Sequence, residues 1–164
     1  MLTENELYRV KKKFEINKNY QWIIGLSKNI GTNFFLNKLV SNYKRTLFKL
    51  INFNLLCTNN IISQPSVYWK NSFFQNIGYF NEKLNYNMDY DMWLRMIKIS
   101  QLLKFKNKLS YFRRHDESLS HKNLIKQFSE KFETMRKYNK NVIICVLHLF
   151  LSLIIVFIYK ITNY

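Results

Sequence analysis

The amino-acid sequence predicts an α/β protein, because helix-like and strand-like segments alternate along it. Apolar residues spaced three and four apart indicate amphipathic helices, and short β-branched or aromatic runs indicate buried strands. The 164 residues allow one domain of ordinary size. Hydrophobic residues make up 48% of the chain and charged residues 22%, which permits a packed core and argues against wholesale disorder.

The first third of the chain opens with a capping box, Thr3 to Glu6, followed by apolar residues at helical spacing. The aromatic and β-branched run that comes next is bounded by Gly25, which predicts a short strand. A polar, Asn-rich stretch then predicts irregular structure before a second apolar helix. The expected helix, strand, irregular stretch and helix lie at 4–17, 20–24, 27–44 and 47–56.

The middle of the chain is punctuated by Pro65 and Gly78. Proline biases its neighbour toward extended backbone, and glycine suits a left-handed helix end, so we expect a short helix between Asn71 and Gly78. A further helix opens at Asp89 or Asp91. The remaining expected elements are extended pieces around Pro65, two strands and a basic helix, at 61–69, 102–105, 109–112 and 120–139.

Basic residues outnumber acidic ones, since 26 Lys+Arg against 10 Asp+Glu give a formal net charge of +16. Such a balance is typical of proteins with an anionic partner: nucleic acid, an acidic membrane surface or a phosphate-bearing substrate. Compositional drift toward Lys, Asn, Ile and Tyr explains the charge equally well. The charge alone therefore does not select a function.

Residues 142–159 carry no formal charge, and as a helix they would span about 27 Å, close to the roughly 30 Å of a bilayer core. A buried helix is the rival interpretation, but no polar face is present to meet water. More basic residues precede this segment than follow it, which by the positive-inside rule places the preceding residues on the cytoplasmic side. We therefore expect a single-pass membrane protein.

Two carboxylates, Asp89 and Asp91, lie two residues apart where a helix is expected to begin. At that position, free backbone N–H groups and the helix dipole stabilise the charged form of a carboxylate. A carboxylate fixed between a loop and a helix is well placed to act as a general base. A helix cap is the competing interpretation of either residue.

A second polar cluster consists of Arg113, Arg114 and His115 and follows the strand expected at 109–112. Two guanidinium groups beside an imidazole can hold a diphosphate, and the imidazole can also bind a divalent metal ion. An ordinary basic surface loop would have the same composition.

Four motifs occur in a fixed order: ISQPSVYWK at 62–70, GYFNEKL at 78–84, YNMDYDMWLR at 86–95 and YFRRH at 111–115. In order and spacing they resemble the second half of a family 2 glycosyltransferase. The resemblance covers about 2–120, most firmly from 61 onward. It implies a GT-A fold, that is, a mixed sheet with helices on both sides. It also implies sugar transfer from a nucleotide-sugar, usually with inversion and with Mg²⁺ or Mn²⁺.

The resemblance also implies roles for single residues. Asp89 matches the general base of the family, and Asp91 is the alternative base or a helix cap. Arg113 and Arg114 would bind the diphosphate, and His115 would bind the metal ion or the diphosphate.

A third set of residues matches the segment that shapes the acceptor side in this family, namely Gln64, Ser66 and Trp69. Core packing competes with sugar stacking as the role of Trp69 and of Trp93. The acceptor-side role is therefore implied by the resemblance and not by the residue types themselves.

The departures from the family concern its nucleotide-binding half. That βαβ half, and the Asp-x-Asp motif that holds the metal ion, have no counterpart in this sequence, and Asn81 replaces a usual acid. The predicted fold is therefore an incomplete GT-A-like mixed sheet with flanking helices and a transmembrane helix. We expect little or no activity from the chain alone. Three alternative explanations account for the missing nucleotide-binding half: a split gene, a misassigned start or a decayed remnant.

The predicted organisation is a partial glycosyltransferase domain at 1–120, a basic amphipathic helix or linker at 121–141 and a transmembrane helix at 142–159. The expected partners are a nucleotide-sugar donor, a cell-surface glycan or lipid-linked acceptor, the membrane and a separately encoded N-terminal half. The alternative is a small basic membrane-tethered protein that binds nucleic acid or anionic lipid. We disfavour it because it leaves the ordered motifs unexplained.

Overall fold

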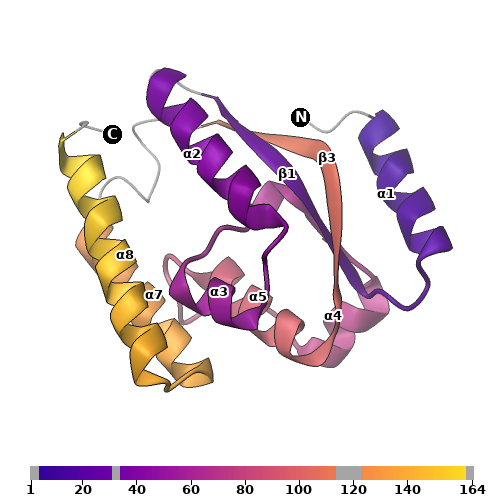
Figure 1. Ribbon diagram of the computed structural model, residues 1–164. Coiled ribbons are helices and arrows are strands. Elements are labelled where there is room, and N and C mark those ends of the chain that lie inside the picture. Colours follow the sequence, from indigo (N-terminus) through magenta and orange to yellow (C-terminus); the bar gives the residue numbers. More distant parts are fainter. Residues whose placement is uncertain (1–3, 31–33, 114–122, 162–164) are drawn as a thin grey trace. The chain divides into compact units, whose positions relative to one another are not determined.

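The computed structural model describes residues 4–30, 34–113 and 123–161, and these form an α/β protein with a small mixed sheet (Figure 1). The described helices and strands are α1 Glu4–Ile16, β1 Trp22–Ile30, α2 Phe34–Phe48, α3 Phe53–Thr58, η1 Gln64–Ser66, β2 Val67–Trp69, α4 Asn71–Ile77, α5 Met88–Ile99, β3 Leu102–Arg113, α7 Leu124–Tyr138 and α8 Val142–Ile161. They divide into two compact units.

The first unit comprises 1–50, 61–79 and 97–114 and contains the sheet. Strand β1 is central, paired antiparallel with β2 and parallel with β3, so the strand order is β2-β1-β3. Trp22, Ile23 and Ile24 are all buried, on both faces of β1. A continuous apolar run of this kind is typical of a strand that is covered on both sides.

Helix α1 packs on this sheet through Val10, which forms an apolar cluster with Ile23 of β1 and Leu109 of β3. Phe14 and Phe105 extend the cluster. A second helix of this unit, α2, also contacts β1 (Figure 1). The apolar spacing that predicted α1 is confirmed as a buried face at Val10 and in part at Phe14, whereas Leu7 is 58% exposed.

Gly25 lies inside β1, where the register with β3 shifts on the two following residues. A Cβ atom at this position would collide with the side chain of Leu109. The glycine is thus required by close packing at an irregularity in the ladder, and it does not end the strand.

Gly78 follows α4 with φ 85°, and its N–H donates to Phe74 O at 3.2 Å. Only glycine adopts this backbone conformation without strain, which confirms the helix end predicted there. The start of the same helix differs from the prediction, because Lys70 and not Asn71 occupies the N-cap position.

The second unit comprises 51–60, 80–96 and 115–164. It contains α3, most of α5, α7 and α8, and in it α8 lies beside α3 and α7. Helix α5 contributes a nearly continuous buried run, which includes Tyr90, Trp93 and Leu94. Trp93 therefore packs in the core of this unit.

Three further segments differ from the sequence-based prediction. The single helix expected at 47–56 is absent, because α2 ends at Phe48 and α3 begins at Phe53. The Asn-rich stretch expected to be irregular contains α2, because its apolar residues recur at helical spacing despite the polar composition. The two strands expected at 102–105 and 109–112 are one strand, β3, which pairs with β1 past the irregularity at Gly25.

The prediction of a transmembrane helix is wrong. Among the helices in the described part of the chain, none is both long enough and apolar enough to cross a membrane. Residues 142–159 lie in α8, which packs against α3 and α7 and buries two polar side chains, His148 and Ser152. The predicted single-pass membrane location and its cytoplasmic orientation depended on that helix, so they are wrong as well.

Candidate active site

Asp89 lies in the first turn of α5, where the chain passes from a loop into the helix. The first helical hydrogen bond here runs from Asp91 N to Asn87 O, at 3.0 Å. The Asp89 side chain is partly exposed, and its Oδ1 accepts the N–H of Tyr90 at 2.7 Å. Backbone N–H groups and the helix dipole therefore favour the charged form of a carboxylate that solvent reaches.

Asp91, two residues further on, is 4% exposed and bonded through both oxygens. Its Oδ1 accepts from the Tyr138 hydroxyl at 2.7 Å, and its Oδ2 pairs with Arg95 Nε at 3.0 Å. Burial and the bond to Asp91 raise the pKa of the Tyr138 hydroxyl, so Tyr138 remains a donor. Asp91 thus fastens α5 to α7, and the two neighbouring carboxylates have different environments.

The loop before α5 is held by a single carboxylate, that of Glu130 on α7. Its oxygens accept the backbone N–H groups of Asn85, Tyr86 and Asn87, each at 2.8 Å. The Asn87 amide adds a fourth bond at 3.1 Å. Burial alone would raise the pKa of Glu130, but these donors outweigh it and hold the pKa below its ordinary value.

Helix α5 is also anchored to α3. The buried Tyr90 hydroxyl donates to Leu56 O at 2.8 Å, and burial raises its pKa. Lys131 of α7 is 7% exposed and donates to Asn59 Oδ1, just beyond α3, at 2.7 Å. The first turn of α5 is consequently fixed by directional bonds to two other elements of its unit.

The residues predicted to shape the acceptor side belong to the first unit, on η1 and β2. Ser66 is fully buried and donates to Ser63 O at 2.7 Å, which gives it a structural role. Trp69 is partly buried and stacks on Phe74, with ring centroids 5.5 Å apart. Of the three, only Gln64 has an exposed side chain.

The predicted diphosphate and metal residues fall at the edge of what the structure describes. Arg113 is the last residue of β3, and nothing is described of its side chain. Arg114 and His115 lie outside the described residues. Their roles stay predictions.

A divalent metal ion of the kind the resemblance implies needs several oxygen or nitrogen ligands close together. Within the described ranges, no three His, Cys, Asp or Glu side chains are grouped in that way. Asp91 is not available as a ligand because Tyr138 and Arg95 occupy both of its oxygens. The described residues therefore do not fit a metal ion.

Sequence reasoning missed Glu130 and Tyr138, whose partners lie more than forty residues away in the chain. No local periodicity reports a contact of that separation. One signal was available: the chain has only 10 acidic residues, so an acid within a basic helix stood out as a candidate for a specific bond.

Comparisons with models of known protein families, with curated protein sequences and with solved structures give no match.

Proposed function

We propose that this chain provides the acceptor side and the general base of an inverting sugar transfer from a nucleotide-sugar. The donor nucleotide would be bound by a separate half, in the same polypeptide or in another. The proposal rests on the four ordered motifs and on the placement of Asp89.

The observation that carries the proposal is the contrast between Asp89 and Asp91. Asp91 is buried and bonded on both oxygens, as a residue that holds a helix in place would be. Asp89 keeps a partly exposed carboxylate in a loop-to-helix turn. Of the two, Asp89 is therefore the better candidate for the base, because a base must reach its substrate.

In this reaction the Asp89 carboxylate takes the proton of the acceptor hydroxyl. The acceptor oxygen then forms a bond to the anomeric carbon of the sugar, on the face opposite the diphosphate. The bond between that carbon and the diphosphate oxygen breaks, and the nucleoside diphosphate leaves with the electron pair. Inversion follows from attack on the opposite face.

The remaining roles rest on sequence resemblance alone. They assign the leaving diphosphate to Arg113 and Arg114, and a metal ion or the diphosphate to His115. Gln64 keeps its proposed acceptor-side role because its side chain is exposed.

The proposal is tested by nucleotide-sugar turnover, measured as release of nucleoside diphosphate. These 164 residues alone should release little or none, because the proposal assigns donor binding to a separate half. An extract of cells that express the chain should transfer sugar, and the Asp89→Asn chain should not restore that activity to cells that lack it. Glu82→Gln, an exposed acid in the same unit, is the matched control. Equal restoration by both variants would overturn the proposal.

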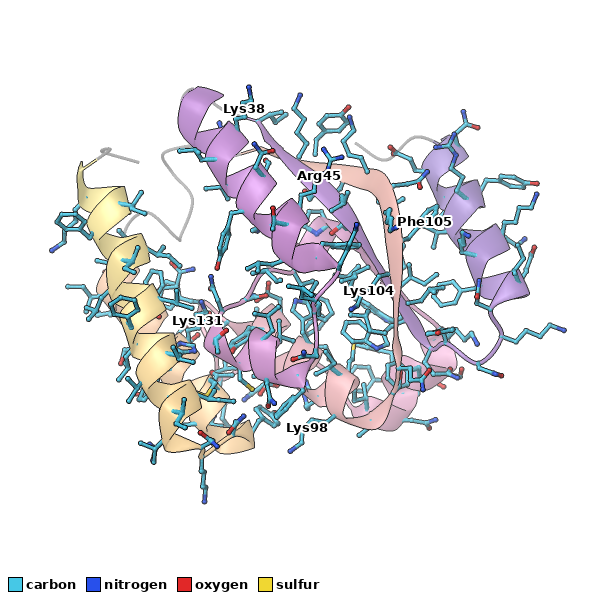
Figure 2. The ribbon with its side chains drawn as sticks, in the orientation of Figure 1. Lys38, Arg45, Lys98, Lys104, Phe105 and Lys131 are labelled. Atoms are coloured by element: carbon cyan, nitrogen blue, oxygen red, sulfur yellow. The ribbon has the colours of Figure 1, made fainter. Side chains whose placement is uncertain are left out.

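A second candidate, binding of nucleic acid, is favoured by exposed basic residues in the first unit. Lys38 and Arg45, labelled in Figure 2, are exposed on α2. Not every basic residue can contact a nucleic acid, however. Lys104 donates to Lys49 O at 2.8 Å, and Lys131 is buried. Salt-dependent binding of RNA or DNA that Lys38→Gln weakens and Asp89→Asn leaves unchanged would support this candidate.

A further inference from the structure

Helix α8 buries two polar side chains and exposes ten large apolar ones. His148 and Ser152 are buried, and His148 Nδ1 lies 2.7 Å from the Cys57 carbonyl oxygen of α3. The opposite half of the helix exposes large apolar residues from Val142 to Ile158. A face of this kind requires a cover, because water is an unfavourable neighbour for it.

Five of the exposed apolar positions on this face follow a strict spacing of three and four residues. We call them the α8 seam: Ile143, Val146, Phe150, Leu153 and Phe157. Alternating spacings of three and four produce a nearly straight apolar stripe, which is the arrangement by which one helix packs along another. The spacing therefore indicates a helix as the occupant.

The area of the exposed face is that of a protein interface. Ten large apolar side chains of α8 are exposed. At roughly 100 Å² each they present about 1,000 Å², more than the 300–600 Å² of the largest patch on a typical monomer. A standard interface buries about 800 Å² on each partner, so the seam together with the exposed apolar residues beside it offers the area that a stable dimer needs.

We propose that the α8 seam is a dimerisation surface, on which the seam of a second copy of this chain packs. A second copy supplies the matching spacing, the matching area and the same absence of charge along the face. This inference is independent of the sugar-transfer proposal, since it uses none of the residues assigned there.

The charge of the chain makes the proposal more specific. Each copy carries +16, so two copies repel each other and salt should strengthen their association by screening the repulsion. Binding of the same helix to an anionic lipid surface would respond in the opposite way, because salt weakens attraction between unlike charges.

The test is sedimentation velocity of the full chain at low and high salt, without detergent. The wild-type chain should sediment as a dimer, more completely at high salt. The double variant Phe150→Gln/Leu153→Gln should raise the dimer dissociation constant at least tenfold. These residues are 59% and 69% exposed, so their replacement should leave the fold and its circular dichroism intact.

Ile125→Gln is the matched control, because Ile125 is 72% exposed on α7, outside the seam. It should leave the dimer unchanged. A monomeric wild-type chain, or equal weakening by the control, would overturn the proposal. So would a chain that stays monomeric and co-sediments with phosphatidylcholine vesicles, which would make lipid the occupant.

Discussion

Helices α5 and α8 contribute to the same unit but make opposite use of their side chains. Along α5, apolar residues fill the core, and Tyr90 and Asp91 of the first turn are bonded to partners on α3 and α7. Along α8, His148 and Ser152 are buried while ten large apolar side chains are exposed. Among the described residues, α5 is bonded to both α3 and α7, whereas α8 exposes ten large apolar side chains.

This difference shows which properties depend on the chain alone. The placement of α5 is over-determined by hydrogen bonds, so single substitutions there should change stability by measurable amounts. The outer face of α8 contributes little to the isolated chain, so substitutions there should change association instead. The following predictions test the contrast, from the largest expected effect on stability to the smallest.

Replacing Asp91 should have the largest effect. Asp91→Ala leaves Arg95 and Tyr138 without their shared acceptor, and removing one partner of a buried pair costs about 3 kcal/mol. Urea unfolding measures the loss. Tyr138→Phe, which removes one bond and keeps the ion pair, should cost less. A loss below that of Tyr138→Phe would contradict the structural role of Asp91.

Replacing Glu130 should have the next largest effect. Glu130→Gln removes the charge that accepts three backbone N–H groups, with an expected loss of about 2 kcal/mol. Amide hydrogen exchange should accelerate at Asn85, Tyr86 and Asn87 before it does in the sheet. Glu133→Gln, an exposed acid on the same helix, is the control. Unchanged exchange in the loop would show that another contact holds it.

The free energy of unfolding should decrease as the pH is lowered below neutrality, because of His148. Burial lowers its pKa from 6.5 to about 4, so below about pH 6.5 the unfolded chain takes up a proton that the folded chain does not. The free energy of unfolding should therefore decrease by up to about 1 kcal/mol per pH unit between these values.

Two variants separate this effect from that of Glu130. His148→Leu should flatten the slope between about pH 6.5 and 5. Glu130→Gln should keep it, because the pKa of Glu130 is lowered from 4.5 and its contribution is lost only at more acid pH. A slope that survives His148→Leu would assign the titration to another group.

Replacing Asp89 should have the smallest effect on stability. Asp89→Asn removes a partly exposed charge at a helix N-terminus, which costs at most about 1 kcal/mol. Thermal unfolding should place this variant near the wild-type chain and well above Asp91→Ala. A loss as large as that of Asp91→Ala would mean that both acids hold the fold, and would remove the basis for assigning Asp89 to catalysis.

The sequence predicted those elements whose signals are local. Each of these signals is contained in a few neighbouring residues: the periodicity of α1, the positive φ of Gly78 and the two acids in the first turn of α5. It failed where composition concealed periodicity, as in α2, and where one long strand was divided by a charged, irregular middle, as in β3.

The candidate site was predictable only in part, for a related reason. Asp89 and Asp91 could be located, but their different roles depend on Tyr138 and Glu130, which lie on a helix far along the chain. The transmembrane prediction failed because apolar composition does not report what a helix packs against. The contacts of α8 with α3 and α7 are tertiary, and no window of sequence contains them.

The central claim is that Asp89 acts as the general base of sugar transfer. It is tested most directly in the organism that produces this chain. Asp89→Asn and the control Glu82→Gln would be introduced separately at the chromosomal locus, and cell-surface and lipid-linked glycans compared by mass spectrometry at matched protein levels. The account predicts that one sugar addition disappears with Asp89→Asn and persists with Glu82→Gln. Identical glycans in both strains would contradict it.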